Sequence, residues 1–166
     1  MKQVGLSSIG AVVPQKVLSN YDLEKMVETT DDWIVTRTGI KERRILDKDE
    51  KLLPLLAEAS KNACDKADLD SSKLNFIINS TLTPDRISPA QACEVARELR
   101  AFNSFCFDMN IACSGFVYAL AMAESLLKTR DVSYGLITAG EQLSRVIDYT
   151  DRTSCVIFGD GAAAAV

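Results

Sequence analysis

The residue of this chain whose surroundings best suit chemistry is Cys113, in the run Ala112-Cys113-Ser114-Gly115. An apolar run of strand length, residues 105–109, precedes it and is interrupted only by Asp108. Apolar residues then recur at spacings of four, three and four: Phe116, Leu120, Ala123 and Leu127. That periodicity is helical, so the stretch predicts a strand, a sharp turn and a helix, with Cys113 where the turn becomes helical.

A thiol at the start of a helix suits nucleophilic chemistry. Unpaired backbone N–H groups and the positive end of the helix dipole are concentrated there, and both stabilise a thiolate. Small neighbours let an acyl carbonyl approach the sulfur and the backbone donors. The alternative is a packing role, because free cysteine is among the most commonly buried residue types. The local pattern leaves both interpretations open.

A second group of residues could bind a nucleotide. Trp33 is the only tryptophan, and Arg37 follows it by one helical turn. An exposed indole ring can stack on a base while a guanidinium group holds phosphate. The alternatives are a core aromatic side chain and an ordinary solvated charged face. A capping Thr30 and a terminating Gly39 predict the helix that carries both residues.

The composition excludes several classes of protein. The chain has 166 residues, 47% of them hydrophobic and 25% charged, as in an ordinary globular domain. A formal net charge of −4 argues against nucleic acid as the main partner. No apolar run is long enough to span a membrane, and no signal-peptide pattern opens the sequence, so no membrane partner is expected.

The cysteine and histidine counts bound the chemistry further. Five cysteines, an odd number without a C-x-x-C pair, fit a reduced, cytoplasmic setting. Histidine is absent. A complete Cys–His site, the usual arrangement for a cysteine nucleophile, therefore cannot exist within this chain.

The remaining segments predict alternating strands and helices. Strands are expected at residues 4–13, 76–78, 134–139 and from 155 onward, with a turn at 159–161. Helices are expected from Ser19 or Asn20 to residue 28, over residues 52–67, and after a capping box at residues 88–91. This order requires a parallel sheet with right-handed crossovers, and so an α/β layered fold. The last five residues are apolar and stop in the middle of a strand, so we expect a piece of a longer chain.

Three separated stretches carry a resemblance to a known family. They are T-D-D-W-I-V-T-R-T-G-I-K-E-R-R (30 to 44), F-D-M-N-I-A-C-S-G-F-V-Y-A-L (107 to 120) and D-Y-T-D-R-T-S-C-V-I-F-G-D-G-A (148 to 162). In order and spacing they resemble β-ketoacyl-acyl carrier protein synthase III, the condensing enzyme that starts type II fatty acid synthesis. The resemblance implies a thiolase-like α/β fold, with residues 1–166 as the N-terminal half of its layered αβαβα architecture.

The resemblance also implies roles for individual residues. Cys113 matches the nucleophile that takes an acyl group from a short acyl-coenzyme A before decarboxylative condensation with malonyl-acyl carrier protein. Trp33 matches the residue that stacks on the adenine of coenzyme A, with Arg152 on its other side. Arg37 lies nearby for the phosphates, and Thr29 matches a further contact. No cofactor is implied, because coenzyme A arrives as part of the substrate.

The resemblance further implies a homodimer. The wall of the family's acyl pocket is formed across a two-fold interface, and Ile87 and Ser88 stand where many members have an aromatic residue. The family's histidine and asparagine, which stabilise the carbanion after decarboxylation, lie in a second half that this sequence does not contain. Asn110, Ile111 and Ala163 also depart from the small residues frequent at their positions.

Two alternatives stay open at this stage. The chain could be a non-catalytic half that keeps a dimer surface and a coenzyme A pocket. Within the enzymes, a polyketide-initiating synthase of the same fold is the runner-up.

Overall fold

The structure is a computed structural model that describes residues 2–166. Its strands are β1 (Ile9–Val12), β2 (Val17–Ser19), β3 (Glu42–Arg44), β4 (Phe76–Ser80), β5 (Phe105–Met109), β6 (Gly135–Gln142) and β7 (Asp160–Ala165). Its helices are α1 (Asn20–Leu23), α2 (Asp31–Thr38), α3 (Leu52–Lys66), α4 (Gln91–Glu98), α5 (Gly115–Thr129) and α6 (Arg152–Cys155). Short 3₁₀ turns lie at Ser71–Lys73, Ala112–Ser114 and Leu143–Arg145.

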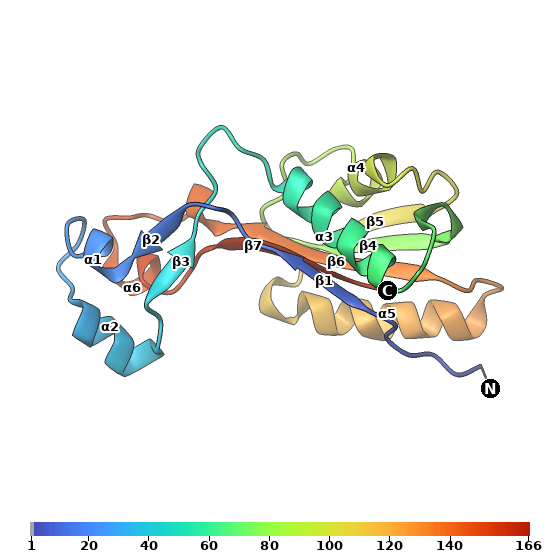
Figure 1. The fold of residues 1–166 in the computed structure, drawn as a ribbon, viewed down its shortest axis with the longest axis horizontal. Helices are drawn as coiled ribbons and strands as arrows, with labels where there is room; N and C mark the ends of the chain where they lie inside the picture. Colours follow the sequence, from blue (N-terminus) through green and yellow to red (C-terminus); the bar gives the residue numbers. More distant parts are fainter. Residues whose placement is uncertain (1) are drawn as a thin grey trace.

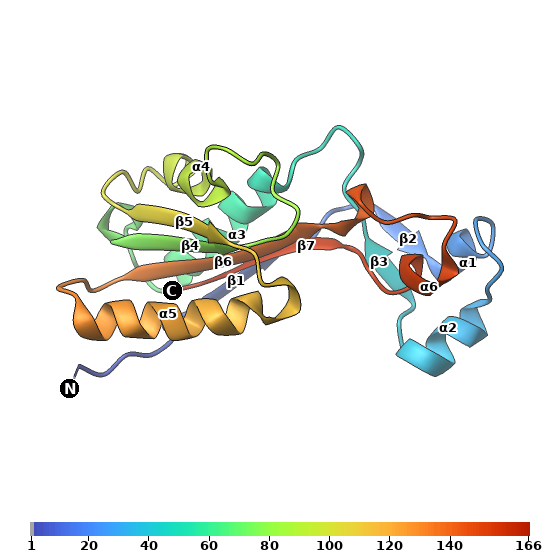
Figure 2. The same ribbon diagram turned by 180° about the vertical axis from the view of Figure 1, so that it is seen from behind.

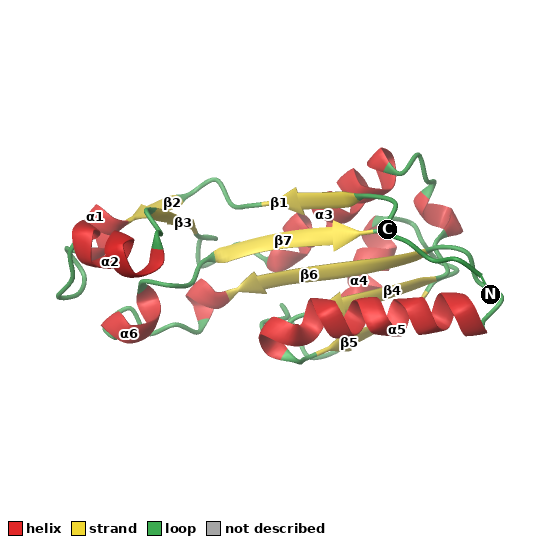
Figure 3. Cartoon of the chain, turned by 90° about the horizontal axis from the view of Figure 1, so that it is seen from below, coloured by secondary structure: helices red, strands yellow, loops and turns green. Residues whose placement is uncertain are grey.

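Five strands form one mixed sheet in the order β1-β7-β6-β4-β5 (Figure 3). β4 pairs in parallel with β5 and β6, whereas β7 runs antiparallel to both β6 and β1. The prediction of a parallel sheet is therefore wrong for β7. Between β6 and β7 the chain leaves one end of the sheet, forms α6 and returns without crossing a face (Figure 1). Strands joined in this way run antiparallel, because only a crossover makes them parallel.

Helices α3 and α4 cover one face of the sheet and α5 covers the other (Figure 2). Strand β4 lies between these layers and is buried along its whole length. Because side chains alternate across a strand, Ile77 packs into the core under α3 and α4, and Phe76 and Ile78 pack under α5. Burial on both faces explains why this strand is an unbroken apolar run in the sequence.

Helix α3 confirms the helix predicted at residues 52–67. Its apolar stripe, which includes Leu56, Ala59 and Ala63, is fully buried. The helix lies so close to β1 that a Cβ at Gly10 would be 2.1 Å from the carbonyl oxygen of Ala59. Glycine at this position is what allows the close approach.

A group of short elements, β2, β3, α1, α2 and α6, lies at one end of the sheet (Figure 1). We call it the end cluster. Its own small core includes Leu23, Ile34 and Cys155. Helix α2 begins and ends as predicted: the Thr30 hydroxyl accepts from the Trp33 N–H at 3.1 Å, and Gly39 ends it with φ of 75°.

Four predictions of local structure need correction. Residues 152–155 form a short helix capped by Asp151, and the strand begins only at Asp160, so the predicted strand at 155 and turn at 159–161 are wrong. No side chain of residues 88–90 caps α4. Helix α1 has the capping box of Ser19 with Asp22 but ends at Leu23, short of residue 28.

Candidate active site

Cys113 lies on a sharp turn between β5 and α5, as the sequence predicts. Ala112 adopts φ of 45°, a left-handed conformation that is uncommon outside glycine. The 3₁₀ turn Ala112–Ser114 runs directly into α5, which begins at Gly115. Cys113 is exposed, and no side chain caps the first turn of the helix. The thiol is therefore accessible beside the backbone N–H groups at the start of a 15-residue helix.

The start of α5 is held against the end of β4. A Cβ at Gly115 would lie 1.8 Å from the Ser80 hydroxyl oxygen, so only glycine allows this contact. Ser80 is the last residue of β4, next to the last residue of β5 in the sheet register, Met109. The carboxyl ends of two parallel strands and the start of a helix thus meet at the turn that carries Cys113.

The other cysteines separate into two kinds. Burial raises the pKa of the Cys64 and Cys106 thiols to about 11, and it also raises the pKa of Cys155. These thiols are protonated at neutral pH and pack as small apolar groups. Only Cys93 shares the exposure of Cys113, and it lies within helix α4 rather than at a helix start.

The predicted nucleotide-binding residues lie together in the end cluster. The guanidinium carbons of Arg37 and Arg152 lie 4.4 Å and 5.1 Å from the centre of the Trp33 ring. Arg152 also donates to the carbonyl oxygen of Glu28 at 3.0 Å. The hydroxyl of Thr29, the next residue, is buried without a hydrogen-bond partner. Two guanidinium groups thus lie against one indole ring, and this combination of cationic and aromatic side chains suits a flat, anionic ligand such as a nucleotide.

Ile87 and Ser88 are exposed on the loop between β4 and α4, and Ile87 is 97% exposed. Their predicted contact with a partner chain stays a prediction. Neighbouring residues fix the loop: the Asp85 carboxylate accepts from the N–H groups of Leu52 and Leu53, at 3.0 and 2.9 Å.

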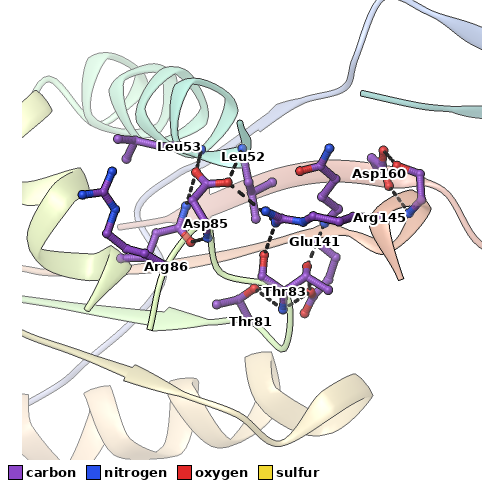
Figure 4. Close-up of polar contacts among 12 residues, drawn as sticks. Leu52, Leu53, Thr81, Thr83, Asp85, Arg86, Glu141, Arg145 and Asp160 are labelled. Carbon is purple, nitrogen blue, oxygen red and sulfur yellow. Dashed lines mark hydrogen bonds and ion pairs between the residues drawn. The ribbon is translucent and has the colours of Figure 1, made fainter. Parts of the chain in front are cut away.

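The sequence analysis did not predict a network of charged side chains just beyond the carboxyl ends of β4 and β6. It contains Asp85, Glu141 and Arg145, and Figure 4 draws it with the residues that it contacts. Asp160 adds a second group of bonds, accepting from the Leu46 N–H and from Ser144. In these contacts the two interacting residues lie far apart in the sequence, so no local pattern indicates them.

Residues 2–166 offer neither a metal site nor a membrane-spanning helix. No group of three or more histidine, cysteine, aspartate or glutamate residues is placed to hold a metal ion there. Within the same residues, none of the helices combines the length and apolar character required to cross a bilayer.

The chain is similar in sequence to proteins of known family. A family model described as 3-oxoacyl-[acyl-carrier-protein (ACP)] synthase III matches residues 107–166. The β-ketoacyl-[acyl-carrier-protein] synthase III of Caldanaerobacter subterraneus is 48% identical over 162 residues, which make up 98% of this chain and 49% of that protein. The protein of the same name from Aquifex aeolicus is 46% identical over 157 residues, 95% of this chain and 50% of that protein.

Solved structures agree in fold. The 3-oxoacyl-[acyl-carrier-protein] synthase III from Aquifex aeolicus matches with a TM-score of 0.93 at 45% identity, covering 96% of this chain and 52% of that chain. A priming β-ketosynthase from the R1128 polyketide biosynthetic pathway matches with the same TM-score at 34% identity, covering 96% and 48%. The chain thus spans about half the length of its relatives. The predicted resemblance and the predicted α/β fold are confirmed.

Proposed function

We propose that this chain, which is 48% identical to a β-ketoacyl-[acyl-carrier-protein] synthase III over 98% of its length, forms the N-terminal half of such an initiating condensing enzyme. The observation that carries the proposal is Cys113, an exposed thiol on a left-handed turn at the start of α5. The fold places this thiol at the carboxyl ends of parallel strands, where α/β proteins commonly bind ligands.

The proposed first step is acyl transfer. The Cys113 thiolate attacks the carbonyl carbon of a short acyl-coenzyme A, and the carbonyl oxygen becomes an oxyanion. Backbone N–H groups at the turn donate to that oxygen, as in other acyl-transfer sites. The oxyanion collapses, the carbon–sulfur bond to coenzyme A breaks, and the leaving thiolate takes up a proton. The product is an acyl thioester on Cys113.

The coenzyme A is proposed to bind through the end cluster. Trp33 and Arg152 would enclose the adenine, Arg37 would contact phosphate, and Thr29 would offer its unpartnered hydroxyl. Helix α2 and the start of α5 lie toward the same end of the sheet (Figure 1). No cofactor is needed for this transfer.

The second step, decarboxylative condensation with malonyl-acyl carrier protein, needs groups outside this chain. Loss of carbon dioxide from the malonyl group leaves a carbanion equivalent, which attacks the acyl thioester on Cys113 and releases the cysteine thiolate. The sequence contains no histidine to stabilise that carbanion. We propose that the histidine and asparagine of the family lie in the other half of the enzyme.

A homodimer is the proposed assembly. β5 is an edge strand that pairs, within residues 2–166, only with β4. Nearby large apolar side chains are strongly exposed, with Ile87 at 97% and Phe102 at 75%. Unpaired strand edges and exposed apolar side chains favour association with another chain. In such a dimer Ile87 and Ser88 would form part of the partner's acyl pocket.

The test is the intact mass of the protein after incubation with acetyl-coenzyme A. We expect one added acetyl group, absent from the Cys113→Ser variant and retained in Cys93→Ser, which removes the other exposed thiol. An unchanged mass in folded wild-type protein would favour a non-catalytic half instead. The polyketide alternative is supported by the similarity to a priming ketosynthase.

A further inference from the structure

The Glu141 carboxylate, near the carboxyl end of β6, accepts four hydrogen bonds from the segment that follows β4. This segment comprises residues 81–83, and we call it the 81–83 segment. Oε1 accepts from the Leu82 N–H at 2.9 Å. Oε2 accepts from the Thr83 N–H at 3.0 Å, from the Thr83 hydroxyl at 2.5 Å and from the Thr81 hydroxyl at 3.2 Å. The 81–83 segment therefore wraps around one side chain (Figure 4).

A second set of contacts fixes the segment from the residues after Glu141. The Gln142 N–H donates to the Thr83 hydroxyl oxygen at 2.8 Å. Arg145 donates to the Thr83 carbonyl at 2.9 Å and lies 3.6 Å from the Asp85 carboxylate. Thr81 and Thr83 are themselves buried. The segment is thus held by hydrogen bonds to Glu141, Gln142 and Arg145, and it has little freedom to move independently.

Thr81 of this segment and Ser80 just before it contact the two ends of the Cys113 turn. The Thr81 N–H donates to the carbonyl of Met109, the last residue before the turn, at 3.1 Å. Ser80, which precedes the segment, is the residue against which Gly115 packs, just after the turn. Residues 80 and 81 therefore touch the chain immediately before and immediately after residues 110–114.

We propose that Glu141 is a positioning residue for Cys113. By holding the 81–83 segment, it fixes the two ends of the turn and so the direction in which the thiol meets an acyl carbonyl. The proposal rests on the proposed acyl transfer, because orientation matters only where the sulfur must approach a bound carbonyl. Glu141 acts through the segment and does not itself contact the reacting atoms.

The chemistry of the side chain supports this assignment. An ionised carboxylate only accepts hydrogen bonds, and its two oxygens can receive four donors. A glutamine in the same place has one oxygen, and its NH₂ group would face donors that it cannot satisfy. Glu141→Gln therefore changes the hold on the segment while leaving size and shape nearly the same.

The chain offers a matched control in Asp160, whose carboxylate accepts three hydrogen bonds from Leu46 and Ser144. Asp160 pairs with Gln142 in the sheet register, next to Glu141, but holds none of residues 80–83. Asp160→Asn thus removes another carboxylate that accepts several hydrogen bonds in the same region, without touching the Cys113 turn.

The experiment compares wild type, Glu141→Gln and Asp160→Asn by two measurements on the full chain. The first is the rate of Cys113 acylation by acetyl-coenzyme A, followed by intact mass at saturating substrate. The second is hydrogen–deuterium exchange at the amides of residues 110–115, which needs no substrate. We expect Glu141→Gln to slow acylation by about 10- to 100-fold, the size expected from misplacing a reacting group. We expect faster exchange at 110–115 in the same variant, and neither effect in Asp160→Asn.

Each outcome decides the proposal. Unchanged acylation and exchange in Glu141→Gln would overturn it, and so would equal effects in Asp160→Asn, which would indicate general loosening. If wild type itself is not acylated, the proposed function fails, whereas the exchange measurement still tests whether Glu141 orders the turn.

A second pair of variants covers the case in which Glu141→Gln does not fold. Thr83→Val removes the hydroxyl that donates to Glu141, and Thr83→Ser keeps it. We expect slower acylation and faster exchange only in the valine variant. Equal behaviour of the two would contradict the assignment.

Discussion

The contact between Gly115 and Ser80 allows a prediction of stability with a defined magnitude. In Gly115→Ala, the new Cβ would lie 1.8 Å from the Ser80 Oγ and 3.1 Å from its Cβ. Ordinary contacts between heavy atoms are about 3.5–4 Å, so either the hydroxyl must rotate away or the helix must move. Ser80 is 5% exposed, which leaves little room for either response.

The expected cost follows from two opposing effects. Overpacking of this kind costs about 1–3 kcal/mol. Alanine in place of glycine in a helix returns up to about 1 kcal/mol. We therefore expect Gly115→Ala to lower the free energy of unfolding by about 1–2 kcal/mol.

A double-mutant cycle separates the steric clash from other effects. Ser80→Gly removes both atoms that the new methyl group would meet, so the clash should vanish in the double variant. Urea denaturation of the four proteins, followed by circular dichroism, gives a coupling energy that we expect to be about 1–2 kcal/mol. Ser80→Ala, which leaves the contact at 3.1 Å, should relieve only part of the cost. The reasoning is refuted if Gly115→Ala is as stable as wild type, or if Ser80→Gly does not relieve its cost.

Three further predictions follow from other parts of the molecule. Because Trp33 is the only tryptophan, added coenzyme A should change the protein's fluorescence, and Arg152→Ala should raise the Kd for coenzyme A about three- to tenfold; an unchanged Kd would contradict the stacking role. The Asp22 pKa is lowered from 3.8 to about 2, mainly by the serine hydroxyl that it faces. A carboxyl with a depressed pKa stabilises the fold above its unfolded pKa, and that stabilisation is lost as pH falls toward 2. Melting temperature measured against pH should therefore fall less steeply between pH 4 and 2 in Asp22→Asn; identical curves would refute this. Iodoacetamide at pH 8 should alkylate exposed Cys113 and leave Cys64, whose pKa is about 11, unmodified in the folded protein, as peptide mapping would reveal.

The sequence predicts well those features whose cause is local. The strand, turn and helix around Cys113 follow from hydrophobic spacing and small residues, and the structure confirms them. The cap at Thr30 and the end at Gly39 follow from side-chain and backbone preferences of single residues. The proximity of Trp33, Arg37 and Arg152 is different, because Arg152 reaches Trp33 only through the fold. Resemblance to a family predicted that approach, and spacing alone could not.

The features that the sequence does not predict depend on partners far along the chain. A turn was expected at Gly159-Asp160-Gly161, because such residues favour turns. In the structure Asp160 opens β7, and its carboxylate accepts from Leu46 and Ser144, which lie 114 and 16 residues away. Glu141 has no local signal either. An acidic residue near the end of an apolar strand is usually solvated, and only the fold places the 81–83 segment against it.

The failed capping box at residues 88–91 has the same cause, and it bears on how the site is built. Neither α3 nor α4 is capped by its own N-cap residue, Lys51 or Ala90. The first N–H groups of α3 donate instead to Asp85, and those of α4 donate to Asp108 on β5 at 2.7 and 2.9 Å.

A remote cap joins two parts of the chain that a local cap would leave independent. Asp85 lies two residues before Ile87, and the Gln91 side chain that opens α4 both donates to its carboxylate and accepts from its N–H. The loop that presents Ile87 is therefore fixed by the same bonds that satisfy the start of α3. Since an unsatisfied helix start costs about 0.5–2 kcal/mol, movement of this loop would also destabilise α3. The position of the proposed pocket wall is thus maintained by the stability of the layer of helices behind it.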